Sequence, residues 1–181
     1  MRHLLTAGAA ALALGLPAAG QATPDPQGIW LTEKERAAVK LEPCSDGQGM
    51  CGTVWWLEPD GELVFDKHNP DPEKRSRPMC GMTVLWGFEK DGGRKWEDGK
   101  LYKPDEGKVY NAFFKLKDPD RMKVSGYIGF EFISKSQTWT RTSADAHPKC
   151  ETPDEVPASL EAEANDDSAP DRSPVQARGG K

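Results

Sequence analysis

The sequence predicts an all-β fold, an antiparallel up-and-down β-barrel of about eight strands. Three observations lead to this prediction. Apolar residues come in short runs of four to ten residues. In the later runs they alternate with polar residues at period two, as along a strand with one buried face. Clusters of Gly, Pro, Asp and Ser separate the runs, and such clusters are typical of tight turns.

Eight runs are candidate strands. In order they are GIWLT (28–32), RAAVKLE (36–42), CGTVWWL (51–57), MTVLWGFE (82–89), KLYK (100–103), KVYNAFFKL (108–116), RMKVSGYIGF (121–130) and QTWTRT (137–142). The connections contain SDGQG, DGG, PDEG, KDPD and SKS. Strands joined in sequence order without crossover helices favour an antiparallel meander, and closing the meander into a barrel removes its exposed edges. An open sandwich is the alternative architecture.

The alternation is clearest in the sixth and seventh runs. One face of the sixth run would carry Tyr110, Ala112, Phe114 and Leu116, and one face of the seventh would carry Met122, Val124, Ile128 and Phe130. Side chains two residues apart share a face of a strand. These two sets are therefore expected to point into the barrel.

The two ends of the strand pattern favour the barrel over the sandwich. A Gly-x-Trp opens the first run with Gly28 and Trp30, and a Trp-x-Arg closes the last with Trp139 and Arg141. The first and last strands of an up-and-down barrel are neighbours, so Arg141 is expected to lie across the indole of Trp30 and close one end. Such stacking contributes about 0.5 to 2 kcal/mol.

This pair of motifs resembles the signature of the lipocalin and fatty-acid-binding superfamily, the calycins. Further motifs, read in order, resemble the exported bacterial family labelled domain of unknown function 2147: CSDGQGMCGTVWWLEP, DKHNPDPEKRSRPMCGMTVLWGFE, WEDGKLYKPDEGKVYNAFFKL, MKVSGYIG and SQTWTRT. The resemblance covers residues 28–141 and implies a small, exported all-β domain. It implies no activity and no catalytic residues, because the family is named for lacking a known function.

The N-terminus has the layout of a cleavable signal peptide over residues 1–22. A basic start is followed by an apolar run from Leu4 to about Leu16, then by Pro17 and small residues at Gly20 and Ala22. The apolar run is too short for a spanning helix, which needs about 20 residues. The mature chain is therefore expected to be periplasmic or secreted and not membrane-spanning.

The four cysteines are expected to form two disulfides, because export leads to an oxidising compartment. Four cysteines allow three pairings. We favour Cys44 with Cys51, since a short Gly-rich turn between two strand ends brings them close. Cys80 with Cys150 then follows by elimination, and the family resemblance lends this second pair no support.

Charge divides the chain into a domain and a tail. Residues 151–181 hold eight acids against three bases, a net charge of −5, and the whole chain also carries −5. The Pro-, Ala- and acid-rich composition of this tail predicts disorder, because it cannot bury enough apolar surface to offset the entropy of ordering. The barrel domain is expected over residues 23–150. Its near-neutral charge, without a basic stripe, indicates no nucleic-acid binding.

Two motifs that suggest chemistry have simpler explanations. Residues 47–52, GQGMCG, spell a Gly-x-Gly-x-x-Gly, but a strand rather than a helix follows, so a hairpin turn is indicated and no cofactor is expected. The mature chain has only His68 and His147, and neither a Gly-x-Ser-x-Gly elbow nor an unpaired cysteine is present. No catalytic residues are predicted.

The stretch DKHNPDPEKRSRPMCG (66–81) concentrates polar side chains between two strands. It is interpreted as a proline-stiffened loop, since Asn-Pro begins a turn and the arginines offset the acids. A ligand- or partner-binding loop is the second interpretation, and a metal or catalytic site the third. A calcium loop would need a Gly at its sharp turn, and no metal is expected. The candidate polar residues are Asp66, His68, Asn69, Asp71 and Arg77.

Three functions follow in decreasing order of preference. The first is a non-enzymatic periplasmic barrel that binds a small apolar molecule in its interior, with Trp56, Trp86, Phe114 and Tyr127 as candidate walls. The second is a protein-interaction or envelope-maintenance module with a packed core, and the third is a hydrolase using Asp66, His68 and Asp71. An eight-stranded barrel can be filled by side chains or hold one small ligand. A continuous cavity would favour the first hypothesis and a filled interior the second.

Overall fold

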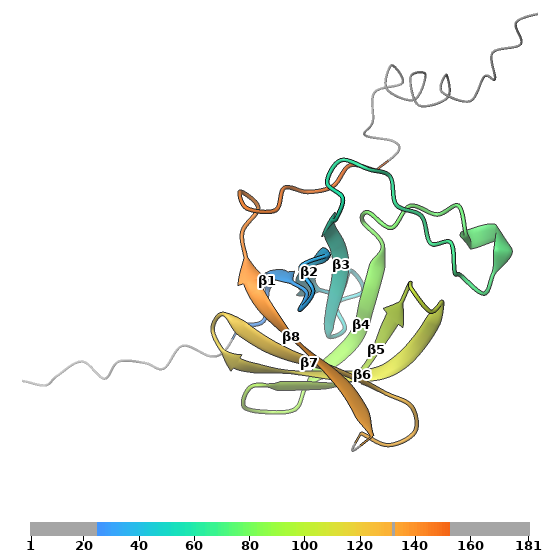
Figure 1. Cartoon of the computed structure of the whole chain (residues 1–181). Coiled ribbons are helices and arrows are strands. Elements are labelled where there is room, and N and C mark those ends of the chain that lie inside the picture. Colours follow the sequence, from blue (N-terminus) through green and yellow to red (C-terminus); the bar gives the residue numbers. More distant parts are fainter. Residues whose placement is uncertain (1–24, 132, 153–181) are drawn as a thin grey trace, which may run out of the picture.

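Eight antiparallel strands close into a barrel in which each strand pairs with its neighbour in sequence and the last pairs with the first (Figure 1). The structure is a computed structural model that describes residues 25–131 and 133–152. The predicted signal peptide lies outside the described residues, and so does all of the predicted tail except residues 151 and 152. The fold prediction is confirmed. None of the described residues forms a helix long and apolar enough to cross a membrane.

The strands follow the predicted order closely. They are β1 (Gly28–Leu31), β2 (Ala37–Pro43), β3 (Met50–Leu57), β4 (Thr83–Lys90), β5 (Lys95–Lys103), β6 (Lys108–Asp118), β7 (Arg121–Tyr127) and β8 (Ser134–Thr142). A short 3-10 helix, η1 (Pro72–Lys74), interrupts the connection between β3 and β4. Most bounds agree with the predicted runs within one or two residues, and the larger differences are in β5, β7 and β8.

The prediction for the seventh strand was wrong at its C-terminal end. β7 ends at Tyr127, and Gly129 adopts a φ of 81°, a left-handed conformation that turns the chain out of the sheet. Ile128 and Phe130 therefore do not share the inner face with Met122 and Val124. They are 73% and 68% exposed, whereas Met122 is fully buried.

Arg141 closes the end of the barrel where β1 and β8 meet, as predicted. Trp30 and Arg141 are register partners, and the guanidinium carbon of Arg141 lies 4.3 Å from the centre of the Trp30 ring. The guanidinium also donates hydrogen bonds to the backbone carbonyls of Pro119, Gln27 and Asp25 at 2.6 to 3.0 Å. One side chain thus ties the N-terminal segment and the turn between β6 and β7 to the end of the core.

Replacing Arg141 by lysine is expected to lower the free energy of unfolding by about 2 kcal/mol, because an ammonium cannot reproduce the planar fork or the stacking. Urea unfolding followed by tryptophan fluorescence measures the loss. The matched control is Arg94→Lys, since Arg94 donates to only one carbonyl, that of Lys117. Equal losses in the two variants would contradict the assigned closing role of Arg141.

Apolar side chains fill the interior of the barrel. The fully buried large ones include Trp30, Leu41, Leu85, Phe88, Phe114 and Met122. The Phe114 ring stacks on Trp96 with ring centres 5.1 Å apart and tilts against Phe88 at 5.0 Å. The surroundings of two glycines show that little space remains between the core side chains. A Cβ placed on Gly99 would lie 2.4 Å from the Phe88 ring, and one on Gly52 would lie 2.9 Å from Leu41, Leu85 and Val39.

Gly99→Ala is expected to destabilise the barrel by about 2 kcal/mol, because the added methyl must displace the Phe88 ring in a close-packed core. Gly126→Ala is the matched control, since its Cβ would meet Tyr110 at an ordinary 3.5 Å. Thermal unfolding of both variants gives the comparison. A Gly99→Ala protein as stable as Gly126→Ala would show that the interior has spare volume around Phe88.

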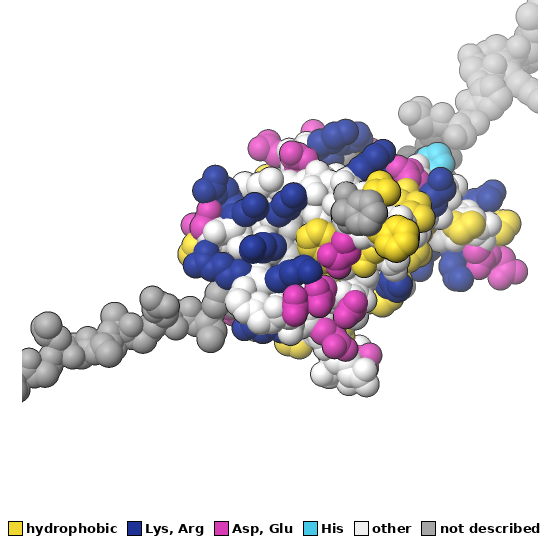
Figure 2. Space-filling view, turned by 90° about the horizontal axis from the view of Figure 1, so that it is seen from below, with side chains coloured by type: hydrophobic (Ala, Val, Ile, Leu, Met, Phe, Trp, Pro, Cys, Tyr) yellow, Lys and Arg dark blue, Asp and Glu magenta, His cyan; other side chains and the backbone are white. Residues whose placement is uncertain are grey.

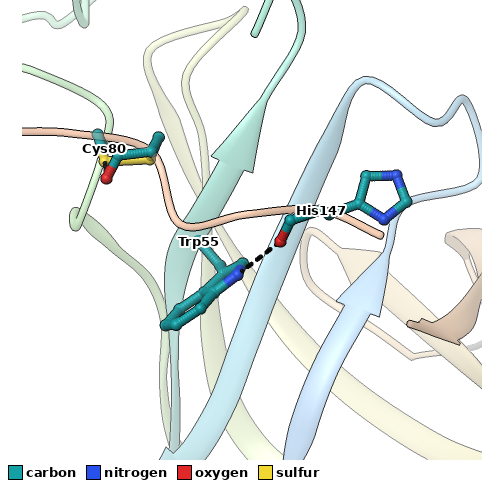
Figure 3. Close-up of a disulfide and its surroundings, with 4 residues drawn as sticks. Trp55, Cys80 and His147 are labelled. Carbon is teal, nitrogen blue, oxygen red and sulfur yellow. Dashed lines mark hydrogen bonds between the residues drawn. A yellow bond between two sulfur atoms is a disulfide. The ribbon is translucent and has the colours of Figure 1, made fainter. Parts of the chain in front are cut away.

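The segment after β8 crosses the outside of the barrel as a strap, defined here as residues 143–152. The Trp55 indole donates to the His147 carbonyl at 2.9 Å (Figure 3). The His147 ring packs edge-on against Trp56 with ring centres 4.6 Å apart. The Cys80–Cys150 disulfide fixes the far end of the strap, and the Cys44–Cys51 disulfide links the ends of β2 and β3. Both predicted pairings are confirmed.

Candidate functional site

The connection between β3 and β4 lies outside the barrel, beside the ends of β4 and β5 (Figure 1). An isolated antiparallel bridge between Phe65 and Pro78 closes its base, and the Asp66 N–H donates to the Arg77 carbonyl at 3.0 Å. We call residues 62–82 the β3–β4 loop. It contains all five polar residues that the sequence analysis singled out, and the structure brings three of them into one hydrogen-bonded network.

Asp66 is the centre of this network and is 1% exposed. One carboxylate oxygen accepts from the Tyr102 hydroxyl at 2.7 Å. The other accepts from the Asn69 amide at 2.7 Å and from the Arg77 guanidinium at 2.9 Å. Asn69 also donates to the Tyr102 oxygen at 3.1 Å. A buried carboxylate is tolerated when its oxygens are paired in this way, so the network fixes the loop against β5.

The ionisation of the network follows from these contacts. Burial acts to raise the pKa of Asp66, but the hydrogen bonds from Asn69, Tyr102 and Arg77 together outweigh it and lower the pKa. Burial and the hydrogen bond to Asp66 raise the pKa of Tyr102 to about 12. At neutral pH Asp66 is therefore a carboxylate and Tyr102 a neutral donor.

Asp71 does not join Asp66 in an acid–base pair. Its carboxylate caps η1 by accepting from the Glu73 N–H at 3.1 Å, and it pairs with Lys74 at 2.9 Å. The hydrogen bond from Lys74 lowers the pKa of Asp71, so this carboxyl is ionised as well. Neither aspartate holds a proton near neutral pH, as a general acid would need to.

His68 is an exposed residue of the β3–β4 loop. Its backbone lies against the turn between β5 and β6, where a Cβ on Gly107 would come within 1.9 Å of the His68 carbonyl oxygen. Within the described part of the chain, the His68 ring makes no hydrogen bond or ion pair. No group of three or more His, Cys, Asp or Glu side chains among the described residues could hold a metal ion.

Two surface hollows flank the β3–β4 loop. The first has a volume of about 330 Å³, and its lining includes Leu63, Phe65 and Met79 with Lys67 and His68. The second has a volume of about 410 Å³ and is lined by Arg77, Pro78, Cys80, Gly81, Met82, Thr83 and Thr152. Both are open to solvent. Arg77 connects the second hollow to the network, since its guanidinium holds Asp66 while the residue lines that hollow.

The four aromatic residues considered as cavity walls lie in separate places. Phe114 is buried in the core, and Trp56 contacts His147 of the strap. Tyr127 packs against Phe113, with ring centres 6.3 Å apart, and Trp86 is half-buried against the core. None of the four lines either hollow.

Tyr102 and Gly107 are the loop-holding residues that the sequence analysis missed. Tyr102 stands 36 positions from its partner Asp66, and no local pattern marks a hydroxyl that will meet a distant carboxylate. The PDEG turn that contains Gly107 was recognised as a turn, but its contact with His68 depends on how the two connections pack.

The comparisons with known proteins agree with this architecture. The family described as an uncharacterized protein conserved in bacteria, DUF2147, matches residues 28–141. The chain belongs to this family. The matched range holds all of β1 to β7, the β3–β4 loop and β8 up to Arg141, so the buried network and the closing Trp30–Arg141 pair both lie inside the DUF2147 region.

The fold is similar to that of a solved structure, protein HP1028 from the human pathogen Helicobacter pylori, described as belonging to the lipocalin family. The TM-score is 0.61 and the sequence identity 22%, with 68% of this chain and 87% of the other covered. At this identity the likeness concerns the fold alone. A search of curated proteins finds no match. The lipocalin-like frame of this DUF2147 protein is thus supported by both sequence and structure.

Proposed function

We propose that this protein is a non-enzymatic binding module of an oxidising compartment, which recognises another exported polypeptide through its β3–β4 loop. The observation that carries the proposal is the combination of a filled barrel with a loop outside it that is rigidly held by the Asp66 network. Preorganised loops bind with a smaller loss of conformational entropy. Two disulfides support an extracellular or periplasmic setting.

The hollow beside Phe65 suggests what such a partner would present. Its lining combines apolar Val64, Phe65 and Met79 with charged Lys67 and Asp105. Apolar pockets with a charged rim accept single anchor side chains at protein interfaces. An apolar side chain flanked by polar ones on an extended segment of the partner fits this hollow best.

The chemistry of the loop supports binding rather than catalysis. The two aspartates have lowered pKa values, and the His68 ring has no described partner to orient it. A hydrolase would need a base held within hydrogen-bonding reach of a nucleophile.

A photo-cross-linking residue placed at Leu63, which is 40% exposed, tests the proposal in living cells. A discrete adduct with one exported protein is expected, whereas the same residue at Lys34 in the turn between β1 and β2 should give none. The adduct should then be lost when Met79→Asp is added and retained when Val109→Asp is added. Equal adducts from the Leu63 and Lys34 positions, or an adduct that Met79→Asp leaves unchanged, would refute partner binding at the β3–β4 loop.

A small apolar ligand inside the barrel is the second candidate, and the likeness to a lipocalin-family structure favours it. The packing around Gly52 and Gly99 argues against it in the layer occupied by Phe88 and Phe114. Native mass spectrometry of protein purified from its own compartment distinguishes the two functions. A mass equal to that of the bare chain removes the second candidate, and a stoichiometric extra mass that disappears on unfolding removes the first.

A further inference from the structure

The connection from β7 to β8 carries three large apolar side chains that are exposed to solvent and do not belong to the core. Ile128, Phe130 and Ile133 are 73%, 68% and 66% exposed, and they lie within six positions of one another. Single exposed apolar residues are ordinary on a protein surface, but a cluster of large ones marks a contact surface. We call residues 128–131 and 133 the apolar tip.

Lysines form a row on the outer face of the sheet nearby. Lys95 on β5 is the register partner of Lys115 on β6, and Lys115 is the partner of Lys123 on β7. Like charges directly opposite each other on adjacent strands destabilise a sheet. Among the described residues no acid pairs with Lys115 or Lys123, nor with Lys117 two positions along β6.

An ion pair joins the apolar tip to the lysine row. The Lys95 ammonium lies 3.5 Å from the carboxylate of Glu131 in the tip and 2.5 Å from that of Glu97. The Lys95 ammonium also lies 5.1 Å from the centre of the Phe113 ring, beside Tyr127 at the end of β7. Figure 2 shows this side of the barrel, with Lys and Arg side chains gathered on one part and hydrophobic side chains on another. Lys95 also lies 3.9 Å from the Asp91 carboxylate, so its single charge offsets only part of the negative charge beside the tip. Lys115, Lys117 and Lys123 have no acidic partner among the described residues.

We propose that this face docks peripherally on an anionic phospholipid bilayer, with the apolar tip entering the interface and Lys115, Lys117 and Lys123 facing the headgroups. An apolar insertion beside a basic patch supplies the two signals that peripheral membrane binding needs. The tip protrudes as a turn rather than forming a flat strand edge, so it can enter a fluid interface. Unpaired lysines on neighbouring strands, about 5 Å apart, need mobile anions rather than one matched acidic partner.

Vesicle flotation with the purified protein, its C-terminal tail retained, tests the docking. One set of vesicles is phosphatidylcholine alone and the other contains one third phosphatidylglycerol. Binding is expected only to the second set at about 0.1 M salt and should be largely lost at about 0.5 M salt, since screening weakens surface charge interactions. Lys115→Gln with Lys123→Gln should lower the partition coefficient about 25-fold, at about fivefold for each lysine.

Matched variants separate the two parts of the surface. Ile128→Ser with Phe130→Ser should lower partitioning at least about tenfold, because both apolar side chains lose their burial in the interface. Leu63→Ser on the β3–β4 loop, and Lys34→Gln with Lys108→Gln, should leave partitioning unchanged. Circular dichroism confirms folding of each variant.

Three outcomes overturn the proposal. They are equal binding to the two kinds of vesicle, equal losses in the matched variants, and binding to soluble polyphosphate without binding to vesicles. None of these outcomes bears on the partner of the β3–β4 loop, so the two proposals stand or fall separately.

Discussion

Replacing both Cys80 and Cys150 by alanine is expected to lower the free energy of unfolding by about 4 kcal/mol. The two residues are 70 positions apart, and a disulfide stabilises mainly by restricting the unfolded chain, with an effect that grows with the loop it closes. Cys44 and Cys51 are only 7 positions apart, so the same change at that pair should cost about 2 kcal/mol. Guanidinium unfolding of the two double variants measures the difference.

The two disulfide variants should also differ in their local effect, because only the Cys80–Cys150 disulfide fixes the strap. Without the Cys80–Cys150 disulfide, three hydrogen bonds still hold the strap. They join the backbone N–H of residue 150 to the Trp55 carbonyl, the Trp55 indole to the His147 carbonyl, and the Thr142 hydroxyl to the His147 ring. Loosening of the strap should therefore change the fluorescence of Trp55 and Trp56 before global unfolding, and only in the Cys80/Cys150 variant. Equal loss of stability in the two variants, with no early fluorescence change, would contradict this account.

The parts of the fold that the sequence predicted are those specified by local pattern. Period-two alternation and turn residues set the strand order, and the Trp30–Arg141 contact followed because an up-and-down barrel makes its end strands neighbours. The Cys44–Cys51 pair followed from a short turn. Each of these predictions needed only nearby residues plus one rule of topology.

The predictions that failed or fell short depended on a single conformation or on distant packing. The first half of β5 was missed because Asp98 adopts a φ of 59° and the register shifts between Trp96 and Gly99, which breaks the alternation. The turn at Gly129 ended β7 although the apolar alternation continued. A glycine in sequence does not reveal which φ it will adopt.

The candidate site shows the same division. The sequence analysis placed Asp66, Asn69 and Arg77 in one loop. It did not predict that they would contact Tyr102 of β5. Local sequence pattern also could not predict whether the barrel interior is filled or hollow, since this depends on how side chains from all eight strands pack together. The contacts of Gly99 and Gly52 with the core decide that question in favour of filling around Phe88.

Asp66→Asn is expected to lower the free energy of unfolding by about 3 kcal/mol at pH 7. The amide has nearly the shape of the carboxylate, but it loses the charge that faces Arg77. It also replaces one accepting oxygen with an NH2 donor among the donors of Asn69, Arg77 and Tyr102. Breaking one side of a buried ion pair costs about 3 to 5 kcal/mol. The lower end applies because the Arg77 side chain is 43% exposed. Asp71→Asn is the control and should lose less, because the cap on η1 and the ion pair with Lys74 both lie at an exposed turn.

The same substitution should change how stability depends on pH. A carboxyl whose pKa is lower in the folded than in the unfolded state binds fewer protons when folded, so acid favours the unfolded chain. The contribution of Asp66 is therefore complete above the ordinary pKa of 3.8 and is lost as the pH falls through its lowered folded-state pKa. Urea unfolding between pH 7 and pH 2 should show the two proteins converging in acid, because only the natural chain has this contribution to lose. Parallel curves over that whole range would show that Asp66 does not hold the β3–β4 loop through its charge.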